Sequence, residues 1–446
     1  MTMDMMAHPE VTGAPAPALR SSFGSLLLVS LALLVGFTML QSFGIMAESA
    51  KAELHLSDSA LAVVQGVSAA IPLVLFSIPI GIWVDRWNRV AILIVMAIGW
   101  TLGTFVTAAS TSTETLFVGR MLTAIGTTGG LTAVLSLASD YCRPEQRGRA
   151  IVVPNIAKTG GIAAGFAVAG LLLGAVAAQK LPILFGSTPW RSAQWMLGIG
   201  SALLTLPLFL LREPQRHEVE AGPGAPLKVL LAEAKARRGW IIPLFIGQTS
   251  VVMADAAAAI WVSPVLERGY HLHPGEFAGW LGALVLGTGI VGSIIGGIVA
   301  DLGQSSRVRG GLLIGAIVAA IIGVPSALFP IMPGVGSFAF TIGALMLAGN
   351  VTAMVASVAL TVWLPNELRG LGIGAFIAVA GLIGFGVAPS LVTLVSGWLG
   401  GESHLSMALA IVGVTVSLIS VLGFGLAMKR APVAATFQTG LDKAVR

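Results

Sequence analysis

Charged side chains are scarce in this chain of 446 residues, of which Asp, Glu, Lys and Arg make up only 10%. A soluble domain carries about a quarter charged residues, so the composition excludes an ordinary soluble protein. Cysteine is nearly absent: Cys142 stands alone, which excludes an intrachain disulfide. The sequence also lacks the Cys and His spacings of zinc or haem sites, so we expect no metal and no cofactor.

Groups that would serve an enzyme or an ATP-driven pump are missing as well. No Gly-x-x-x-x-Gly-Lys loop occurs, which excludes a nucleotide-driven pump. The six histidines are scattered singly and form no nucleophile or metal cluster, so we expect that the protein is not an enzyme. Only two tyrosines occur, which argues against a site that stacks on sugar rings.

Long apolar runs dominate instead: 56% of the residues are hydrophobic and the mean hydropathy is +0.91. A membrane-spanning helix needs about 20 mainly apolar residues. We place spans near 22–46, 60–83, 88–110, 114–140, 150–178, 191–211, 240–265, 276–301, 310–330, 336–363, 371–398 and 404–428. The pattern predicts an all-α membrane protein with about twelve transmembrane helices.

One long polar connection divides these spans into two sets of six. The predicted segments are a tail 1–21, a six-helix bundle 22–211, a linker 212–239, a second bundle 240–429 and a tail 430–446. Within the linker, residues 227–236 are predicted to form a short amphipathic helix on the membrane surface.

Basic residues predict the orientation, because short cytoplasmic loops collect Lys and Arg. With both termini cytoplasmic, most of the 25 basic residues lie inside. The exceptions outside are Lys51, Lys180, Arg191 and Arg268. We expect a multi-pass protein of the plasma membrane, which is the inner membrane in a bacterium. This topology explains the net charge of +5 without nucleic-acid binding. Trp240, Trp261 and Trp280, near span ends, are predicted to be interfacial anchors.

Two short patterns occur once in each half. Residues 81–89 read Gly-Ile-Trp-Val-Asp-Arg-Trp-Asn-Arg, and residues 297–301 read Gly-Ile-Val-Ala-Asp at the matching position after the second span. Residues 144–148, Pro-Glu-Gln-Arg-Gly, are echoed by residues 365–370, Pro-Asn-Glu-Leu-Arg-Gly. Two echoes at similar spacing predict two repeated six-span halves.

The stretch 81–89 resembles the G-x-x-x-D-R-x-x-R loop of the major facilitator superfamily, and Arg120 with its following glycines resembles that family's span-4 motif. The resemblance implies two pseudo-symmetric six-helix bundles, transport by alternating access and a monomer. Span 4 and the loop after it also resemble the spinster-like branch. The chain departs from that branch at Gln41 and Thr127, where the branch has acidic residues.

The same resemblance implies that Asp85 faces the start of span 11, near residues 370–374. A helix N-terminus favours an anion, which supports such a contact independently. Arg86 and Arg89 would complete a cluster that holds the halves together in the outward-facing state and breaks in the inward-facing state; the alternative is positive-inside anchoring alone. The second copy of the loop pattern, at residues 297–301, matches less completely, because Leu302 stands where the first copy has Arg86. The predicted gating residues are Gly81, Asp85, Arg86, Arg89, Gly297 and Asp301.

Ionisable groups inside spans are costly, roughly 2.5–3.5 kcal/mol each, and they commonly face a cavity. Arg120 and Lys158 are two such groups. Asn155 and Thr159 fall on the same helix face as Lys158 by their spacing. This pattern predicts substrate contacts, whereas the alternative is a lysine that extends along the helix to the membrane surface, or an arginine near the outer interface.

Asp255 is the third such group. In the repeat, its position is equivalent to residues 39–41 of span 1. In the family that the chain resembles, spans 1 and 7 line the central cavity. This implies that Gln41, Gln248 and Asp255 are wall residues, and we predict that Asp255 is the proton-coupling site. The alternative is a structural ion pair with Arg120 or Lys158.

Two buried cations against one buried anion predict a positively charged cavity. We therefore expect a proton-coupled secondary transporter of a small organic anion such as a carboxylate, for which Arg offers a planar fork. Its partners would be this solute, protons and the lipid bilayer, with no nucleic acid. The alternatives are a proton-driven exporter of lipophilic drugs or lipids, a membrane enzyme and a non-transporting receptor. The predicted substrate-binding residues are Lys158, Arg120, Asn155, Thr159, Gln41 and Gln248.

Overall fold

The computed structural model describes residues 19–143, 146–214, 235, 237–306, 308–364 and 366–432. The regular structure of these residues is entirely helical, without a strand. Twelve of the described helical segments are long and apolar enough to cross a membrane. The predicted all-α membrane protein is therefore confirmed. The predicted surface helix at 227–236 and the two tails fall almost entirely outside the described residues.

The first six spans end near residue 210, and the second six begin at residue 238. The first set contains α1 (Leu19–Leu54), α2 (Asp58–Ala62), η1 (Val63–Val67), α3 (Ser68–Leu75), α4 (Ser77–Arg86), α5 (Arg89–Ala109), α6 (Thr113–Asp140), α7 (Arg147–Ala177), η3 (Leu184–Gly186), α8 (Pro189–Thr205) and η4 (Leu206–Leu210). The second set contains α10 (Arg238–Gly269), α11 (Pro274–Ser305), η5 (Gly311–Leu313), α12 (Ile314–Ser326), η6 (Phe329–Ile331), α13 (Val335–Trp363), α14 (Asn366–Trp398), η7 (Glu402–His404) and α15 (Leu405–Lys429).

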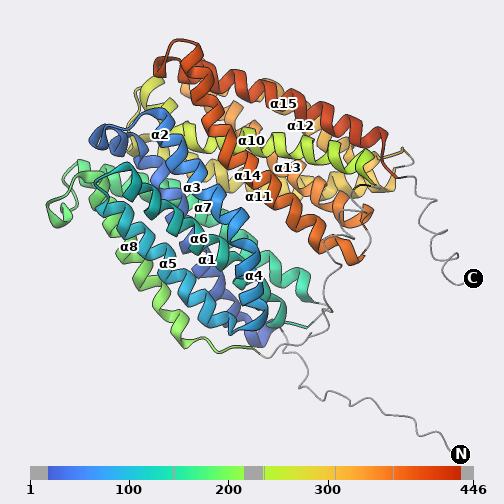
Figure 1. The fold of residues 1–446 in the computed structure, drawn as a ribbon, viewed down its shortest axis with the longest axis horizontal. Helices are drawn as coiled ribbons and strands as arrows, with labels where there is room; N and C mark the ends of the chain where they lie inside the picture. The colour runs from blue at the N-terminus through green and yellow to red at the C-terminus, as the bar shows by residue number, and fades with distance from the viewer. Residues whose placement is uncertain are drawn as a thin grey trace, which may run out of the picture.

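The same packing partners recur in the two sets. The first span, α1, packs against the fifth and sixth, α7 and α8; likewise α10 packs against α14 and α15. The pair α5–α6 is matched by α12–α13. The two sets thus form two pseudo-symmetric six-helix bundles, which Figure 1 shows as the blue-to-green and yellow-to-red parts of the molecule.

Close approach of α5 and α6 depends on glycines in α6. A Cβ added at Gly126 would lie 2.6 Å from the carbonyl oxygen of Met96, and one at Gly130 would lie 2.7 Å from the ring of Trp100. Both distances are too short for real contacts, so only glycine fits. The glycines that follow Arg120 in the sequence therefore fit two helices together.

The second span is broken, unlike the continuous helix that the apolar run 60–83 predicts. It consists of α2, the π-helical turn η1, α3 and α4, with a break at Phe76 between the last two helices. Pro79 has no backbone N–H to donate to the Leu75 carbonyl, which weakens the helix at this point. The span is therefore irregular both near its start and near its end.

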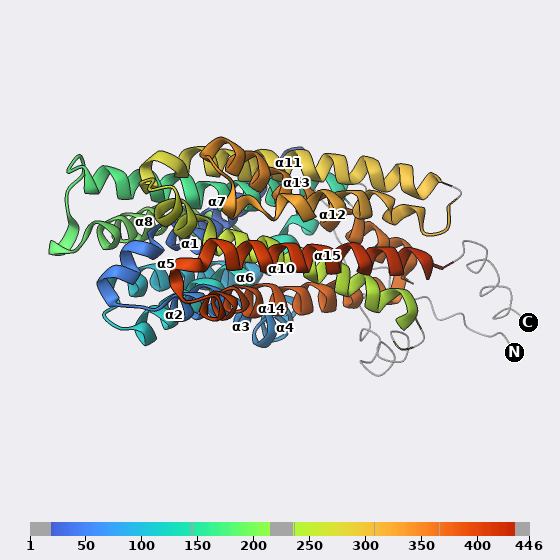
Figure 2. The ribbon, with the colours of Figure 1, turned by 90° about the horizontal axis from the view of Figure 1, so that it is seen from above.

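The two bundles touch along part of their length only. Lys51 marks one end of the molecule and Arg89 the opposite end; these are called the Lys51 end and the Arg89 end. Between the bundles α7 packs against α11, and η1 and α3 pack against α14. Figure 2 shows α7 running beside α11, and Figure 1 shows the bundles close together near α2 and diverging toward α4.

Small residues form these inter-bundle contacts. A Cβ added at Gly282 of α11 would lie 2.6 Å from the carbonyl oxygen of Ala163 in α7, and Gly66 of η1 lies directly against the carbonyl of Phe385 in α14. Along α7 the recorded contacts with α11 run from Gly174 to Thr159. Thr159 is thus the residue nearest the Arg89 end that these glycine contacts place against α11.

Candidate functional site

Lys158 directly precedes Thr159, the residue of α7 that packs against Gly289 of α11. Its side chain is half-buried, and its Nζ lies 5.8 Å from the ring centroid of Phe37 in α1, a cation–π contact. It forms no ion pair with any of the described residues. Asn155, one turn nearer the Arg89 end, is exposed. A free cation thus lies where the space between the bundles begins.

The two polar neighbours of Lys158 hydrogen-bond to their own helix. Asn155 Nδ2 donates to the Ile151 carbonyl at 3.1 Å, and Thr159 Oγ1 donates to the Asn155 carbonyl at 3.1 Å. Thr159 also packs against Gly289 of α11, where a Cβ would lie 2.6 Å from its Cγ2. The shared face predicted for these three residues holds, whereas the side chains do not bind one another.

Arg120 is buried between α6 and α1, with 5% of its surface exposed. Its Nη2 donates to the Leu40 carbonyl at 2.6 Å, and its guanidinium lies 5.1 Å from the ring centroid of Phe43. Its Nε has no hydrogen-bond partner among the described residues. Arg120 therefore ties α6 to α1 and keeps one buried donor free.

Asp255 lies in α10, and its Oδ1 is buried without a hydrogen-bond partner in the described part of the chain. Neither Arg120 nor Lys158 forms an ion pair with it, so the structural pair considered above is not formed. Gly349 of α13 lies against this carboxylate, and a Cβ there would sit 2.8 Å from Oδ1. Asp255 is thus an unpaired acid enclosed by helix packing.

The two predicted glutamines lie on different helices. Gln41 of α1 is half-buried, and its Cβ fills the position beside Gly165 of α7. Gln248 of α10 is 1% exposed, and its Oε1 has no partner in the described residues. The structure therefore brings Lys158, Arg120 and Gln41 together around α1, whereas Gln248 shares α10 with Asp255.

At the Arg89 end, Arg89 contacts the first bundle and the start of the linker, and none of the following contacts reaches the second bundle. Its Nε donates to Glu213 at 2.7 Å, its Nη2 donates to the Pro214 carbonyl at 3.1 Å, and its Nη1 pairs with Asp140 of α6. Burial raises the pKa of the adjacent Tyr141 to about 12, so the phenol stays neutral. One cation and two carboxylates thus set the charge of this cluster.

The other predicted gating residues are not paired across the bundles at this end. Asp85, Arg86 and Asp301 are exposed, and among the described residues no ion pair links the two bundles there. Several side chains at the start of α14 fall outside the described residues. The contact of Asp85 with residues 370–374, and the roles of Gly81 and Gly297, therefore stay predictions.

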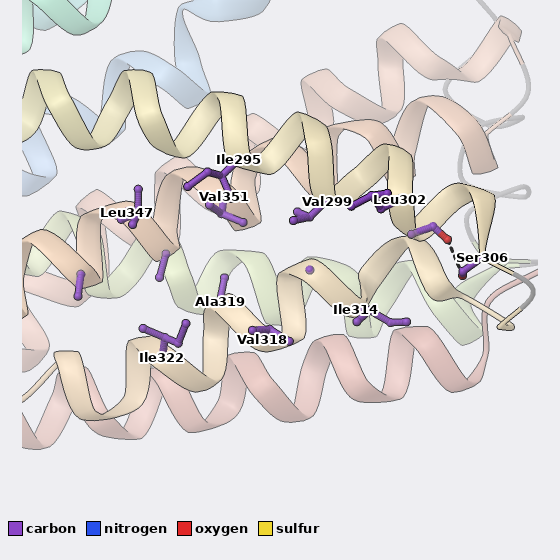
Figure 3. A pocket seen from close by; sticks show the side chains of 14 residues that line it. Ile295, Val299, Leu302, Ser306, Ile314, Val318, Ala319, Ile322, Leu347 and Val351 are labelled. Atoms are coloured by element: carbon purple, nitrogen blue, oxygen red, sulfur yellow. Dashed lines mark hydrogen bonds between the residues drawn. The ribbon is translucent and has the colours of Figure 1, made fainter.

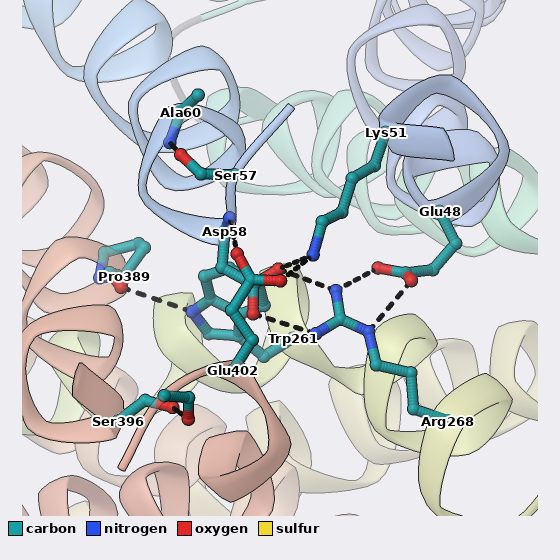
Figure 4. Close-up of polar contacts among 11 residues, drawn as sticks. Glu48, Lys51, Ser57, Asp58, Ala60, Trp261, Arg268, Pro389, Ser396 and Glu402 are labelled. Carbon is teal, nitrogen blue, oxygen red and sulfur yellow. Dashed lines mark hydrogen bonds and ion pairs between the residues drawn. The ribbon is translucent and has the colours of Figure 1, made fainter. Parts of the chain in front are cut away.

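At the Lys51 end, an ion cluster of five residues joins the bundles (Figure 4). Arg268 of α10 donates to Glu48 of α1 at 2.6 Å and to Asp58 of α2 at 2.7 Å. Lys51 pairs with Asp58 at 2.6 Å and also with Glu402 of η7. The backbone N–H of Asp58 donates to Glu402 at 2.7 Å. Residues of both bundles thus share one network, in which Asp58 is buried and Glu402 is exposed.

Local structure places the members of this cluster. Ser57 caps α2 by accepting a hydrogen bond from the Ala60 N–H at 3.1 Å, which puts Asp58 in the first helical turn. Arg268 lies in the last turn of α10, where the helix dipole favours a cation. The sequence interpretation missed Glu48, Asp58 and Glu402 as functional residues. The available signal was that Lys51 and Arg268 lie on the side that is poor in basic residues.

A second ion cluster at this end lies within the first bundle. Glu53 of α1 accepts hydrogen bonds from Thr188 at 2.6 Å, from Trp190 at 2.5 Å and from Arg191 at 2.7 Å. All four residues precede the linker, so this cluster stabilises one bundle and does not connect the two.

A cavity of about 500 Å³ opens between α11, α12 and α13 (Figure 3). Its lining is almost wholly apolar and includes Val299, Val318 and Val351. None of its lining residues belongs to the first bundle, which holds Lys158 and Arg120. The cavity is therefore separate from the candidate site.

Two tryptophans differ from their predicted role as interfacial anchors. Trp261 is 0% exposed and donates to the Pro389 carbonyl of α14 at 3.3 Å. Trp240 is 5% exposed and packs edge-on against Trp363, with ring centroids 5.2 Å apart. The prediction was wrong for both, because neighbouring helices cover the span ends where these rings lie.

Comparison with known proteins places the chain among membrane transporters. It is 26% identical over 165 residues to "Multidrug resistance protein 1" of Bacillus subtilis (strain 168), a match covering 37% of this chain and 39% of that protein. It is 27% identical over 258 residues to an "MFS-type efflux pump" of Mycolicibacterium smegmatis (strain ATCC 700084 / mc(2)155), covering 58% of this chain and 57% of that one. The matches thus span about two fifths of the first relative and somewhat over half of the second.

A similar solved structure is a bacterial homologue of the human lysosomal transporter Spinster, in an inward-facing and occupied conformation. The match has a TM-score of 0.76 at 20% identity, and it covers 92% of this chain and 96% of that one. At this identity the likeness shows the shared fold. The sequence model described as "Major Facilitator Superfamily" matches residues 26–389, most of the chain. Together with the two six-helix bundles, this match shows that the chain belongs to the Major Facilitator Superfamily of transporters.

Proposed function

We propose that the protein is a secondary active transporter that moves a small organic anion, such as a carboxylate, by alternating access. The observation that carries this proposal is Lys158, an unpaired and half-buried cation at the point where the bundles separate. A lysine at this depth is costly unless it binds a partner or water. A solute with a negative group, entering between the bundles, would supply that partner.

Alternating access is supported by the difference between the two ends. At the Lys51 end, Arg268, Lys51 and Glu402 join the bundles, whereas at the Arg89 end the recorded ion pairs stay within one bundle. With both termini in the cytoplasm, the Arg89 end is cytoplasmic and the structure is an inward-facing state. Asp85 and Arg86 then form their contact with α14 in the opposite state, when the Arg89 end closes.

Asp255 is the proposed proton-coupling site. Its buried oxygen lacks a partner among the described residues, and a carboxylate enclosed in this way is stabilised by binding a proton. Asp255 and Lys158 lie in different bundles. A proton bound to Asp255 and a substrate bound to Lys158 would therefore both influence how the two bundles are arranged.

A second candidate is a proton-driven exporter of lipophilic drugs or lipids. It is favoured by the names of the two curated relatives, a multidrug resistance protein and an efflux pump. The chain lacks an acid at Gln41 and at Thr127, where the spinster-like branch has one. The two candidates differ in the charge of the solute that Lys158 would bind.

The test is direct binding of carboxylates and of lipophilic cations to purified protein, read as a thermal shift and as a dissociation constant. Lys158→Ala should weaken carboxylate binding about ten- to hundredfold, because a charge-assisted hydrogen bond is worth roughly 1.5–3 kcal/mol. Lys158→Arg should retain part of the affinity. The matched control is Lys180→Ala, which removes an exposed lysine. Equal carboxylate affinity in Lys158→Ala, or binding of neutral and cationic compounds alone, would favour the exporter.

A further inference from the structure

A group of polar side chains surrounds one turn of α1 on the Lys51 side of Lys158. Gln65 lies in the π-helical turn η1 and is 6% exposed, and its Nε2 has no hydrogen-bond partner among the described residues. Gln41 Nε2 and Gln65 Oε1 each lie 3.6 Å from the position that a Cβ at Gly44 would occupy. The two amides therefore both lie beside Gly44.

Arg120 reaches the same stretch of α1 from α6. It binds the Leu40 carbonyl and covers Phe43, and its Nε is a second buried donor without a partner in the described part of the chain. A buried donor left unpaired costs about 1–3 kcal/mol, so two of them around one helix turn call for an acceptor that the protein itself does not provide.

The π-helical turn explains how Gln65 comes to this place. An extra residue in a helical turn changes which side chains face the neighbouring helices, and such turns are frequent at functional sites. The next residue, Gly66, lies directly on the Phe385 carbonyl of α14. Gln65 therefore lies in the span-2 segment that contacts the second bundle.

This group and Lys158 lie at different heights along α1, and the distance between them can be estimated from the helix. Lys158 Nζ lies over Phe37, whereas Gln65 lies beside Gly44, two turns further along α1. Two turns of helix span about 10 Å. Gln41 lies between these two positions, on the same helix.

We infer that Gln65, with Arg120 and Gln41, forms a second polar subsite of the proposed binding site. This subsite takes a hydrogen-bond-accepting group at one end of an elongated solute, while Lys158 binds the acidic group at the other end. The inference rests on the proposed function and narrows the substrate class to solutes with two acceptor groups about 10 Å apart.

The experiment uses linear dicarboxylates, from succinate to dodecanedioate, and the monocarboxylates of the same lengths as probes for the purified full chain. Affinity should peak at a dicarboxylate of intermediate length, such as sebacate, and exceed that of the matched monocarboxylate about tenfold or more. Gln65→Leu should remove this advantage and leave monocarboxylate binding unchanged. Gln65→Met keeps a similar size and removes the donor without adding charge, so it should give the same result if the leucine variant does not fold.

The matched control is Gln194→Leu. Gln194 of α8 is another buried glutamine whose amide atoms have no partners among the described residues, and it lies outside this group. Its loss should leave the length preference intact. A length preference that survives both Gln65 variants overturns the subsite while the anion carrier stands. If carboxylate affinity is unchanged in Lys158→Ala, or if no carboxylate binds at all, the proposed function is overturned and the subsite with it.

Discussion

We expect the neutralisation of Asp255, the proposed proton-coupling site, to separate proton coupling from solute transport. In Asp255→Asn the side chain keeps its size but can no longer exchange a proton, so uptake driven by a pH gradient should disappear while solute exchange continues. The measurement is transport into proteoliposomes, with and without a pH gradient, for a carboxylate shown to bind.

The control for this prediction is Glu114→Gln, which neutralises an exposed carboxylate in the first turn of α6. It should leave pH-driven accumulation close to that of the parent. Accumulation by Asp255→Asn at the parental level would assign proton coupling to another group.

Candidate site residues that carry a charge could be predicted from the sequence, whereas an uncharged one could not. Arg120, Lys158 and Asp255 stand out because ionisable groups are rare in apolar spans. Gln65 carries no charge, and its importance depends on a π-helical turn and on an unpaired amide that only the folded chain shows. The hydrogen bonds of Asn155 to its own helix were likewise not predictable from spacing.

Among the elements, the α5–α6 pair offers a test of helix packing. Gly126→Ala places a Cβ 2.6 Å from the Met96 carbonyl oxygen and from the Trp100 nitrogen, so the helices must move apart. Overpacking of this kind costs about 1–3 kcal/mol. The unfolding temperature of the purified variant should fall accordingly.

Gly200→Ala in α8 is the matched control, because a Cβ at Gly200 meets no atom within 4 Å. It should unfold at the parental temperature or slightly above, since alanine favours a helix more than glycine does. Equal unfolding temperatures for the two variants would show that α5 and α6 can separate without cost.

Span positions were predictable because helix length and hydropathy decide them, whereas breaks within spans were not. The run 60–83 is apolar throughout, yet the second span contains four helical pieces. Pro79 was a visible cause of one break. The π-helical turn has no comparable sequence mark, since it depends on how η1 packs against α14 and α6.

At the scale of the whole molecule, Arg268 should hold the Lys51 end closed. Arg268→Gln removes the cation that binds Glu48 and Asp58, and leaves two carboxylates facing each other. The bundles should then move apart at this end. Spin labels on Thr111→Cys and Ser403→Cys, in a Cys142→Ser background, would report a longer and broader distance distribution.

Arg191→Gln is the control, since it breaks an ion pair with Glu53 at the same end but inside one bundle. It should leave the distance distribution unchanged. A similar shift in both variants would mean that general destabilisation, and not the inter-bundle cluster, controls the opening.

The repeat predicted the two bundles, because each half carries its own copy of the same loop pattern. It did not predict which residues join them. Asp58 and Glu402 lie 344 positions apart in the chain, and no local pattern links an acid in α2 to one in η7. The ion cluster therefore appears only when both bundles are packed together.

The glycine contacts between the bundles have a mechanical consequence. Gly66, Gly174 and Gly282 bring backbone close to backbone, and side chains near them, such as Ala167 and Ala278, are small. Contacts between small residues leave few long side chains to rearrange if the bundles move as the proposed transport requires. The ion pairs at the Lys51 end would then contribute most to the free-energy difference between the two arrangements.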